Sequence, residues 1–593
     1  MGSGGGTTTP VNPQFTSTPV MGAEEGATYT YQVAASSPDK SAVAFALSNG
    51  PVGATLAGNT VTWTPTHQES RVANAFTVTA TTAAGGSATQ TWNVTPNGNI
   101  NITDVVTYWG ASGPSSANRI WPPGALYPAA LVPQSDGSLA RLNGAESPGG
   151  GFSIPNVPAG YVWLQLGPSG YFWIATSDFD FGEDIVGTPL TGLSSPATTT
   201  FDYSISGLQP AQTGDYITIQ TLAGGLSQLP FPMFLPSGAT SVNESVPAPS
   251  FIDWSQINAI LVSDYVMTSS GAFSGFTLGP TATVTGLTLT DGATNNITAT
   301  LSPSPVATIP LSIQGTQWAS IASGIAPSSS APSSSDYFLY AQPYLMDRLG
   351  ARFLVGTNGP GFTMMRPAAP SPTFISVSGL SSCGSSVISS GFPLLPNPLP
   401  PIVTDVDYGV LSYGDPFPAA WERLFQYCQE TQVSLPRPNS TVTDTFILAD
   451  QQTTAVPAGA VTPILGSVQS PTINGTSIFQ TATLNTTSVN LSWNAPAIGQ
   501  PYGYYVSVYE LGTLTNGGTV EYIPVGQFGT AKTSMQVPFL SAGNTYEFLI
   551  TSETDGLANM EMNPLRRKAP NAEASVVSAP IVIATGTTAA MKR

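Results

Sequence analysis

The sequence is poor in charged residues and in the side chains that most often carry catalysis. Asp, Glu, Lys and Arg make up 8% of its 593 residues, whereas they make up about 25% of an average soluble domain. His67 is the sole histidine, which leaves a Ser-His-Asp or Cys-His mechanism with a single available base. The sequence also lacks a G-x-S-x-G motif and a glycine-rich phosphate loop, which excludes the enzyme classes that depend on them.

Cysteine is almost absent as well, since only Cys383 and Cys428 occur. Zinc requires three or four nitrogen or sulfur ligands, so two cysteines and one histidine do not suffice for a zinc site. An even number of cysteines in an exported chain favours a disulfide between Cys383 and Cys428. Two unpaired, small apolar side chains are the alternative interpretation.

Long apolar runs are missing too. The sequence contains no stretch of eighteen apolar residues, which excludes a conventional transmembrane helix. Fifteen basic and 33 acidic residues give a net charge of −18. Phosphate backbones repel an acidic chain that has no basic stripe, so we expect no nucleic-acid partner.

What the sequence does contain is glycine, proline and short alternating apolar runs. The 60 glycines and 54 prolines divide a 41% hydrophobic chain into many strand-like segments, which predicts an all-β fold of tandem β-sandwiches. We expect one short helix, near residues 418–430. In FPAAWERLFQYCQE, four residues have the spacing of one helical face: Trp421, Leu424, Phe425 and Cys428.

Near the N-terminus, PVGATLAGNTVTWTPT followed by FTVTATTAAGGSATQTWNV resembles the Ig-like, cadherin-like repeats of bacterial surface proteins. In that family a glycine-containing turn leads into a strand that ends W-T-P-T, which Trp63, Thr64 and Pro65 match here. The resemblance implies a β-sandwich over residues 15–97 in which Trp63 packs in the core, preceded by a flexible tether over residues 1–14.

Near the C-terminus, TSVNLSWNAP, YGYYVSVYELG and LSAGNTYEFLI resemble a fibronectin type III domain. The resemblance implies that Trp493 packs in the core and that the Tyr546 hydroxyl bonds back to the main chain, as a tyrosine corner. It implies a module over residues 462–588, followed by a tail over 589–593. The RRK at residues 566–568 is either a solvated loop or a partner contact.

Between these modules, GGGFSIPNVPAGYVWLQLGPSGYFWIATSDFDFG looks like the transthyretin-like or carboxypeptidase-regulatory modules of secreted bacterial proteins. In those modules a turn of the form G-x-F-x-I-x-N-V-P-x-G precedes a strand. The resemblance implies a β-sandwich over residues 98–190, and residues 191–461 form a further β-rich region without a family assignment.

One acidic cluster stands out in a chain with so little charge. The segment TSDFDFGED holds four carboxylates within seven residues: Asp178, Asp180, Glu183 and Asp184. Carboxylate oxygens are the ligands that Ca²⁺ prefers, although the spacing departs from a complete EF-hand loop. The alternatives are a calcium site and a solvated loop, and we expect no other cofactor.

The middle region also holds seven tryptophans. Aromatic rings can stack on sugars, so a carbohydrate-binding face is one interpretation. Trp163 and Trp173 alternate with other large apolar residues, which instead favours a place in the core. The seven are Trp109, Trp121, Trp163, Trp173, Trp254, Trp318 and Trp421.

The first residues, GSGGGTTTP, are typical of the tether that follows the lipid-modified cysteine of a bacterial lipoprotein. We expect the natural precursor to carry a signal peptide and such a cysteine where Met1 stands. A cloning remnant on an ordinary secreted protein is the alternative. Both place the protein outside the cytoplasm: at the cell surface, lipid-anchored at the outer membrane, or facing the periplasm.

The sequence therefore predicts a non-catalytic binding or adhesion protein whose partner is a cell-surface protein or a polysaccharide. We expect its membrane contact to be a lipid anchor only. A self-assembling subunit of a surface layer or appendage is the first alternative, because charge-poor strands suit pairing between copies. A polysaccharide-active enzyme that uses a carboxylate pair is the second. We expect specificity to lie within residues 98–461.

Overall fold

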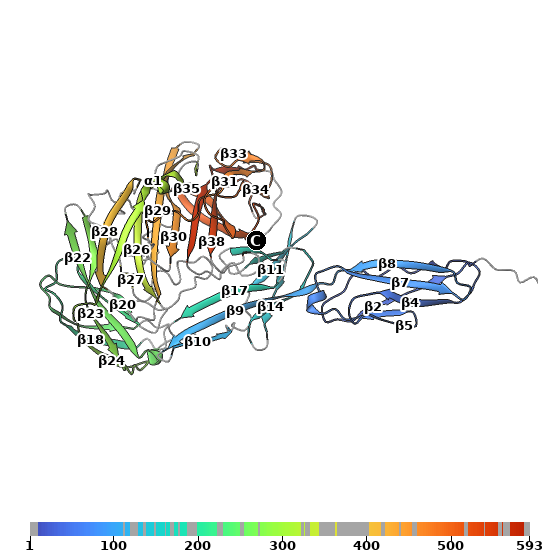
Figure 1. The fold of residues 1–593 in the computed structure, drawn as a ribbon, viewed down its shortest axis with the longest axis horizontal. Coiled ribbons are helices and arrows are strands. Elements are labelled where there is room, and N and C mark those ends of the chain that lie inside the picture. The colour runs from blue at the N-terminus through green and yellow to red at the C-terminus, as the bar shows by residue number, and fades with distance from the viewer. Residues whose placement is uncertain are drawn as a thin grey trace, which may run out of the picture. The chain divides into compact units, whose positions relative to one another are not determined.

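The fold is known from a computed structural model (Figure 1). The structure describes residues 10–585 except 111–112, 119–127, 135–137, 148–149, 161, 166–170, 176–177, 187–197, 222–228, 249–253, 271–272, 322–324, 327–331, 343–361, 364–402, 415, 417–421, 438–439, 454–458, 515–519, 539, 556–559 and 561–569. These residues are almost entirely β-strands and connecting turns. Their one α-helix is α1 (Gly315–Ile321), and none of their helices is long and apolar enough to cross a membrane.

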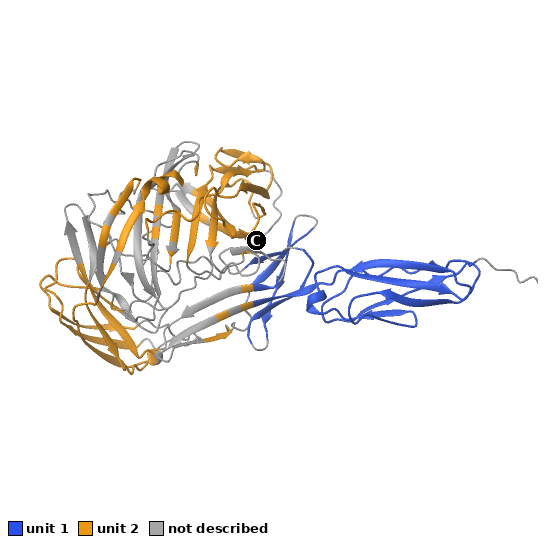
Figure 2. Ribbon diagram, in the orientation of Figure 1, with its two compact units in different colours: residues 1–102, 120–168, 173–179 blue, residues 103–119, 169–172, 180–593 orange. Residues whose placement is uncertain are grey.

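The chain divides into two compact units (Figure 2). The first comprises residues 1–102, 120–168 and 173–179, and the second comprises the remaining residues. Each unit is built from β-sheets with alternating buried and exposed side chains, so the predicted all-β architecture of tandem sandwiches is confirmed.

The N-terminal sandwich of unit 1 consists of two small sheets. One sheet holds β2 (Tyr29–Gln32), β6 (Thr60–Trp63) and β5 (Thr55–Ala57). The other holds β4 (Val43–Asn49), β7 (Asn74–Thr82) and β8 (Ser87–Val94). A separate pair is formed by β1 (Gln14–Phe15) and β3 (Ala35–Ser36).

Aromatic rings fill this sandwich because the inward positions of its strands carry them. Trp63 packs edge-on against Phe76 with ring centroids 5.4 Å apart. Phe76 in turn stacks on Trp92 at 5.2 Å. Trp63 is 2% exposed, so its predicted place in the core is confirmed. Such aromatic pairs stabilise a core beyond the area that they bury, by about 0.5–1.5 kcal/mol each.

The remainder of unit 1 begins with β9 (Gly98–Gly110), whose first residues pair with β14 (Phe152–Val157). The strand β14 also pairs with β13 (Ala145–Glu146). A further set holds β12 (Leu139–Asn143), β11 (Ala129–Pro133) and β15 (Val162–Gln165), in that order. Beyond residue 102, β9 belongs to unit 2, where it pairs with β10 (Gly113–Asn118). Two later strands have residues in both units: β16 (Tyr171–Ala175) and β17 (Phe179–Val186).

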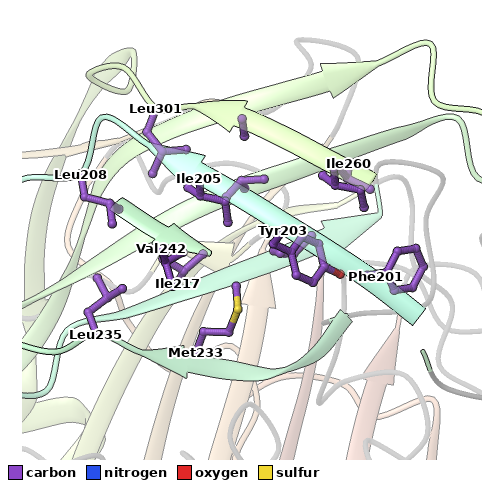
Figure 3. Packing of buried hydrophobic residues seen from close by; sticks show 14 of the residues in the cluster. Phe201, Tyr203, Ile205, Leu208, Ile217, Met233, Leu235, Val242, Ile260 and Leu301 are labelled. Carbon is purple, nitrogen blue, oxygen red and sulfur yellow. The ribbon is translucent and has the colours of Figure 1, made fainter. Parts of the chain in front are cut away.

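Unit 2 contains a second sandwich with a large apolar core (Figure 3). Its core side chains include Phe201, Ile217 and Ile260. One sheet holds β21 (Ser241–Pro247), β18 (Thr200–Ser206) and β24 (Thr294–Thr300), and β18 runs parallel to β24. The other holds β20 (Leu229–Phe234), β19 (Tyr216–Thr221), β22 (Ala259–Ser270) and β23 (Phe273–Thr285). A short 3₁₀ turn, η2 (Trp254–Gln256), precedes β22.

A long sheet dominates the rest of unit 2. Its strands follow the order β36 (Val520–Thr530), β35 (Gly503–Leu514), β38 (Thr545–Asp555), β39 (Asn571–Val577), β30 (Ser440–Thr453), β29 (Glu422–Arg437), β26 (Pro332–Gln342) and β27 (Phe362–Thr363). Two further strands, β25 (Val306–Gln314) and β28 (Asp405–Gly414), pair with each other.

The helix predicted near residues 418–430 is wrong, because Glu422–Arg437 forms β29. This strand pairs with β26 from Glu422 to Thr431 and with β30 from Phe425 to Arg437, so both of its sides are paired over residues 425–431. A helix of that length is marginal without tertiary contacts, so two-sided pairing decides the outcome. Tyr427 and Gln429, two residues apart as on one face of a strand, are both fully buried.

The C-terminal module places a second sheet beside the long one. It holds β32 (Thr476–Ser477), β31 (Gln469–Ile473), β34 (Val489–Asn494) and β37 (Ser534–Val537). The strand β33 (Ala482–Leu484) runs parallel to β40 (Ile581–Ile583). Trp493 is 5% exposed, and the Ser541 N–H donates to Tyr546 Oη at 2.8 Å. Both predicted packing roles are confirmed.

This module shares its main sheet with the preceding region. Its strand β39 pairs with β30, from Ala449 opposite Ala574 to Gln452 opposite Asn571. The sheet is therefore continuous across the boundary predicted between residues 461 and 462. The predicted domain boundaries stay predictions.

Candidate functional site: the junction around His67

The most elaborate group of polar side chains in unit 1 surrounds His67. This residue opens the short 3₁₀ turn η1 (His67–Glu69) after the W-T-P-T strand end. Glu69 holds the turn in place, because its Oε2 accepts a hydrogen bond from the Thr66 N–H at 2.9 Å. The turn therefore presents the imidazole in a fixed position.

Both ring nitrogens of His67 face carboxylates. Nδ1 lies 3.1 Å from both carboxylate oxygens of Glu25, and Nε2 lies 2.9 Å from Asp178 Oδ2. Two acceptors at the two nitrogens favour the imidazolium, in which both nitrogens donate. The Glu25 side chain is 15% exposed, whereas those of His67 and Asp178 are 40% and 44% exposed.

The two carboxylates also accept main-chain hydrogen bonds from β9. The Asn99 N–H donates to Glu25 Oε2 and the Asn101 N–H donates to Asp178 Oδ1, each at 2.8 Å. His67 thus joins three segments: the entry to the N-terminal sandwich, the first residues of β9, and the residue before β17. We call these five residues the His67 junction.

A second contact lies beside the His67 junction. Arg71 donates from Nε to the Pro158 carbonyl at 3.1 Å and from Nη2 to the Gly160 carbonyl at 2.8 Å. Close main-chain approach is required here, because a Cβ at Gly98 would lie 2.2 Å from Ser70 Oγ. The N-terminal sandwich is therefore held against the following strands by a fork of Arg71 bonds as well as by His67.

The local electrostatics favour the charged forms of both partners. Partial burial by itself lowers the pKa of His67, but the hydrogen bonds and charges of Glu25 and Asp178 raise this pKa above 6.5. Burial by itself raises the pKa of Glu25, but hydrogen bonds from Asn99 and His67 bring this pKa below 4.5. The result is a carboxylate–imidazolium–carboxylate arrangement.

This arrangement suits a structural joint better than catalysis. A general base needs an imidazole nitrogen that is free to accept a proton from a substrate. Here both nitrogens donate to carboxylates from distant parts of the chain. The chemistry available to His67 is therefore the fixing of one module against another.

The predicted calcium cluster is only partly described. Asp178 contributes to the His67 junction, and Asp180 lies two residues further along, in β17. Glu183 and Asp184 also belong to β17, but their side chains are outside the described set. Within the described part of the chain no group of three or more His, Cys, Asp or Glu side chains is arranged to hold a metal. The calcium site stays a prediction.

The tryptophans that the structure describes are core residues. Trp163 and Trp318 are 2% and 1% exposed, and Trp254 is fully buried. Trp318 donates from Nε1 to the Val461 carbonyl at 3.2 Å, and its ring lies 4.4 Å from that of Tyr427. These three rings are therefore unavailable for stacking on a sugar. The side chains of Trp109, Trp121, Trp173 and Trp421 lie outside the described residues.

Several other predictions also fall outside the described residues. Cys383 is one of them, and only the main chain of Cys428 is described, in β29. The disulfide between Cys383 and Cys428, the role of the RRK at residues 566–568 and the N-terminal tether therefore stay predictions.

Sequence reasoning missed most of the His67 junction. It named His67 only as the single available base and named neither Glu25 nor the asparagines of β9. The partners of His67 lie 42 and 111 residues away in sequence. The sequence offers only an indirect indication, which is that a chain with few charged residues contains a single histidine.

Comparisons with known proteins identify no family. No protein-family description matches the sequence, and no curated protein matches it. Among solved structures, the N-terminal eight Ig domains of Down Syndrome Cell Adhesion Molecule give a TM-score of 0.13 at 10% identity, over 97% of this chain and 72% of theirs. Sidekick-1 immunoglobulin domains 1–5 give 0.14 at 9%, over 97% and 99%. The Bacteroides ovatus mixed-linkage glucan utilization locus protein SGBP-B gives 0.13 at 10%, over 60% and 90%. Scores this low carry no argument about fold or function, so the architecture rests on the strand pairing above.

Proposed function

We propose that this chain is a non-catalytic binding or adhesion protein that works outside the cytoplasm. The His67 junction carries the proposal, because it fixes the orientation of the N-terminal sandwich relative to the strands that follow it in unit 1. A fixed direction serves a protein that has to hold a binding surface away from its point of attachment. Low charge, modules in series and buried aromatic residues support the same interpretation.

The proposal includes the finer expectations from the sequence. The partner is a cell-surface protein or a polysaccharide, and residues 98–461 supply specificity. A lipid anchor at the natural N-terminus supplies the membrane contact. Mass spectrometry of the native N-terminal peptide checks the anchor, since an unmodified first residue contradicts it.

Binding and catalysis are separated by one experiment on the full chain. We expect saturable binding to at least one member of a panel of immobilised polysaccharides and intact bacterial cells, measured by biolayer interferometry and cell pull-down. A reducing-end assay on the same polysaccharides should remain flat. Release of reducing ends would establish the polysaccharide-active enzyme instead, and absence of saturable binding on the whole panel would contradict the proposal.

A self-assembling subunit is the second candidate, and the outer faces of the N-terminal sandwich favour it. Exposed hydroxyls bond to each other across strands, with Thr77 Oγ1 3.1 Å from Thr91 Oγ1 and Thr55 Oγ1 3.0 Å from Thr62 Oγ1. Faces without charge lower the repulsion between acidic copies. Large, regular polymers in size-exclusion chromatography with light scattering would favour this candidate.

A further inference from the structure

The C-terminal module has a surface hollow that lies outside every site discussed so far. It lies on the outward side of the sheet β32-β31-β34-β37 and has a volume of about 910 Å³. Binding sites for small ligands commonly have volumes of about 300–1,000 Å³. The hollow therefore falls within this size range, and it is open to solvent.

The lining is mostly polar, and Gly475, Leu491 and Met535 complete it. Seven residues with polar side chains line the hollow: Asn474, Thr486, Ser488, Asn490, Ser492, Ser534 and Gln536. None of the described residues that line it is ionisable. Amides and hydroxyls both donate and accept hydrogen bonds, whereas an anionic ligand calls for Arg or Lys and a cationic ligand calls for carboxylates.

Strand pairing places these groups in register. Asn490 lies opposite Gln536, and Ser492 lies opposite Ser534, on the neighbouring strands β34 and β37. All four are exposed, and they alternate with buried residues such as Leu491. Opposite residues on paired strands have Cβ atoms about 4.5–5.5 Å apart, which is close enough for two side chains to contact the same sugar ring.

The turn beside these strands is held firmly. Asn474 has φ +48° and is followed by Gly475 at φ +82°, which fits the two-residue turn between β31 and β32. Asn474 Oδ1 accepts from the Asn490 N–H at 2.9 Å, and the Asn474 N–H donates to the Asn490 carbonyl at 2.8 Å. The first bond occupies Asn474 Oδ1, so the NH₂ group of this amide is the part that donates to a ligand.

One polar atom of the lining lacks a partner. Ser488 Oγ is buried and makes no hydrogen bond with any described residue. Because this oxygen is buried, a ligand in the hollow does not contact it, and the exposed amides and hydroxyls of β34 and β37 supply the binding groups.

We propose that this hollow binds a neutral oligosaccharide. A glycan without charge is the ligand class whose hydroxyls match a lining of amides and hydroxyls. The absence of aromatic rings among the described lining residues points to binding by hydrogen bonds alone, with a Kd in the millimolar range. The inference rests on the proposed binding function and adds a site to it, outside residues 98–461.

Affinity electrophoresis of the full chain tests the site. Native gels should contain amylose, dextran, galactomannan, hydroxyethylcellulose or, as the acidic comparison, polygalacturonate. We expect at least one neutral polysaccharide to retard the protein and polygalacturonate to leave its mobility unchanged. A hexasaccharide of the linkage that retards it then gives the Kd by calorimetry.

The double variant Asn490→Ala, Gln536→Ala assigns binding to the hollow. Both side chains are exposed, so we expect a folded protein whose Kd is about tenfold weaker or more. Asn494→Ala is the matched control, because Asn494 is also exposed on β34 but does not line the hollow. It should bind like the unaltered chain.

Two outcomes would overturn the inference. The first is that no neutral polysaccharide retards the unaltered chain. The second is retardation that the double variant retains in full, which would place binding elsewhere and leave the proposed function standing. If the pull-down described above shows binding to a protein partner and no polysaccharide retards the chain, the inference is likewise overturned.

Discussion

His67 Nε2 lies 2.9 Å from Asp178 Oδ2, although 111 residues separate the two side chains in sequence. This contact and the Glu25 contact at Nδ1 place the sole histidine between two carboxylates. Only 8% of the residues are charged, yet three ionisable side chains contact one another here and connect distant segments of the sequence. The first two predictions concern the His67 junction.

Replacing His67 by glutamine should loosen the His67 junction without unfolding the protein. A glutamine amide is uncharged and holds both of its N–H donors on one nitrogen, so it does not replace the two ring nitrogens of His67, and Glu25 and Asp178 lose their shared cation. Because His67 and Asp178 are partly exposed, we expect a loss of at most about 1 kcal/mol. Hydrogen exchange of the Asn99 and Asn101 amides, read by mass spectrometry of peptides spanning them, should become several-fold faster. The replacement Gln90→Ala, in β8, is a control that should leave this exchange unchanged.

The His67 junction should depend on pH within a defined window. The pKa of His67 is raised above 6.5, so its contribution is complete below 6.5 and is lost as pH rises through the folded-state value. The pKa of Glu25 is lowered below 4.5, so its contribution is present above 4.5 and is lost as pH falls through the folded-state value. Arg71 stays charged throughout and attracts Asp178 at every pH in this window.

Protection of the same two amides, corrected for the intrinsic exchange rate, should therefore be greatest between about pH 4.5 and 6.5. It should decline on the alkaline side, and His67→Gln should abolish that decline. An unaltered alkaline decline in the variant would assign the effect to another group.

Asp264 should make the second sandwich less stable at neutral pH than at mildly acidic pH. Burial and the neighbouring charge of Asp215 raise the pKa of Asp264 from 3.8 to about 7. The folded state then holds a proton that the unfolded state has lost, so stability falls as pH rises from about 4 to about 7. The expected loss is about 2–4 kcal/mol, because Asp264 is 1% exposed.

Calorimetry of Asp264→Asn at pH 5 and pH 8 checks this prediction. The variant should unfold at a higher temperature than the unaltered chain at pH 8, and the difference should shrink at pH 5. An equal shift at both pH values would show that Asn changes packing rather than charge.

Removing the Tyr546 hydroxyl should weaken the C-terminal module. Tyr546→Phe keeps the buried ring but leaves the Ser541 N–H without its acceptor at 2.8 Å. We expect a loss of about 1–1.5 kcal/mol in denaturant unfolding. Ser541→Ala retains the main-chain donor and serves as the control, with a change below about 0.5 kcal/mol. A neutral Tyr546→Phe would mean that the tyrosine corner adds no stability here.

Local sequence patterns were sufficient for the fold class and for individual core residues. Alternating strands separated by Gly and Pro turns report which face of a strand is buried, because side chains point to opposite faces with a period of two. Trp63, Trp493 and Tyr546 could therefore be placed in cores from short motifs, and the structure buries all three.

The tertiary structure alone decided matters that depend on distant partners. The segment from Glu422 to Arg437 carries a helical spacing of apolar residues, yet it becomes a strand because β26 and β30 flank it. His67 acquires its role from Glu25 and Asp178, and the C-terminal hollow needs β34 and β37 in register. The physical reason is the same in each case. A periodicity is a property of one segment, whereas strand pairing and charge pairing depend on which segments the fold brings together.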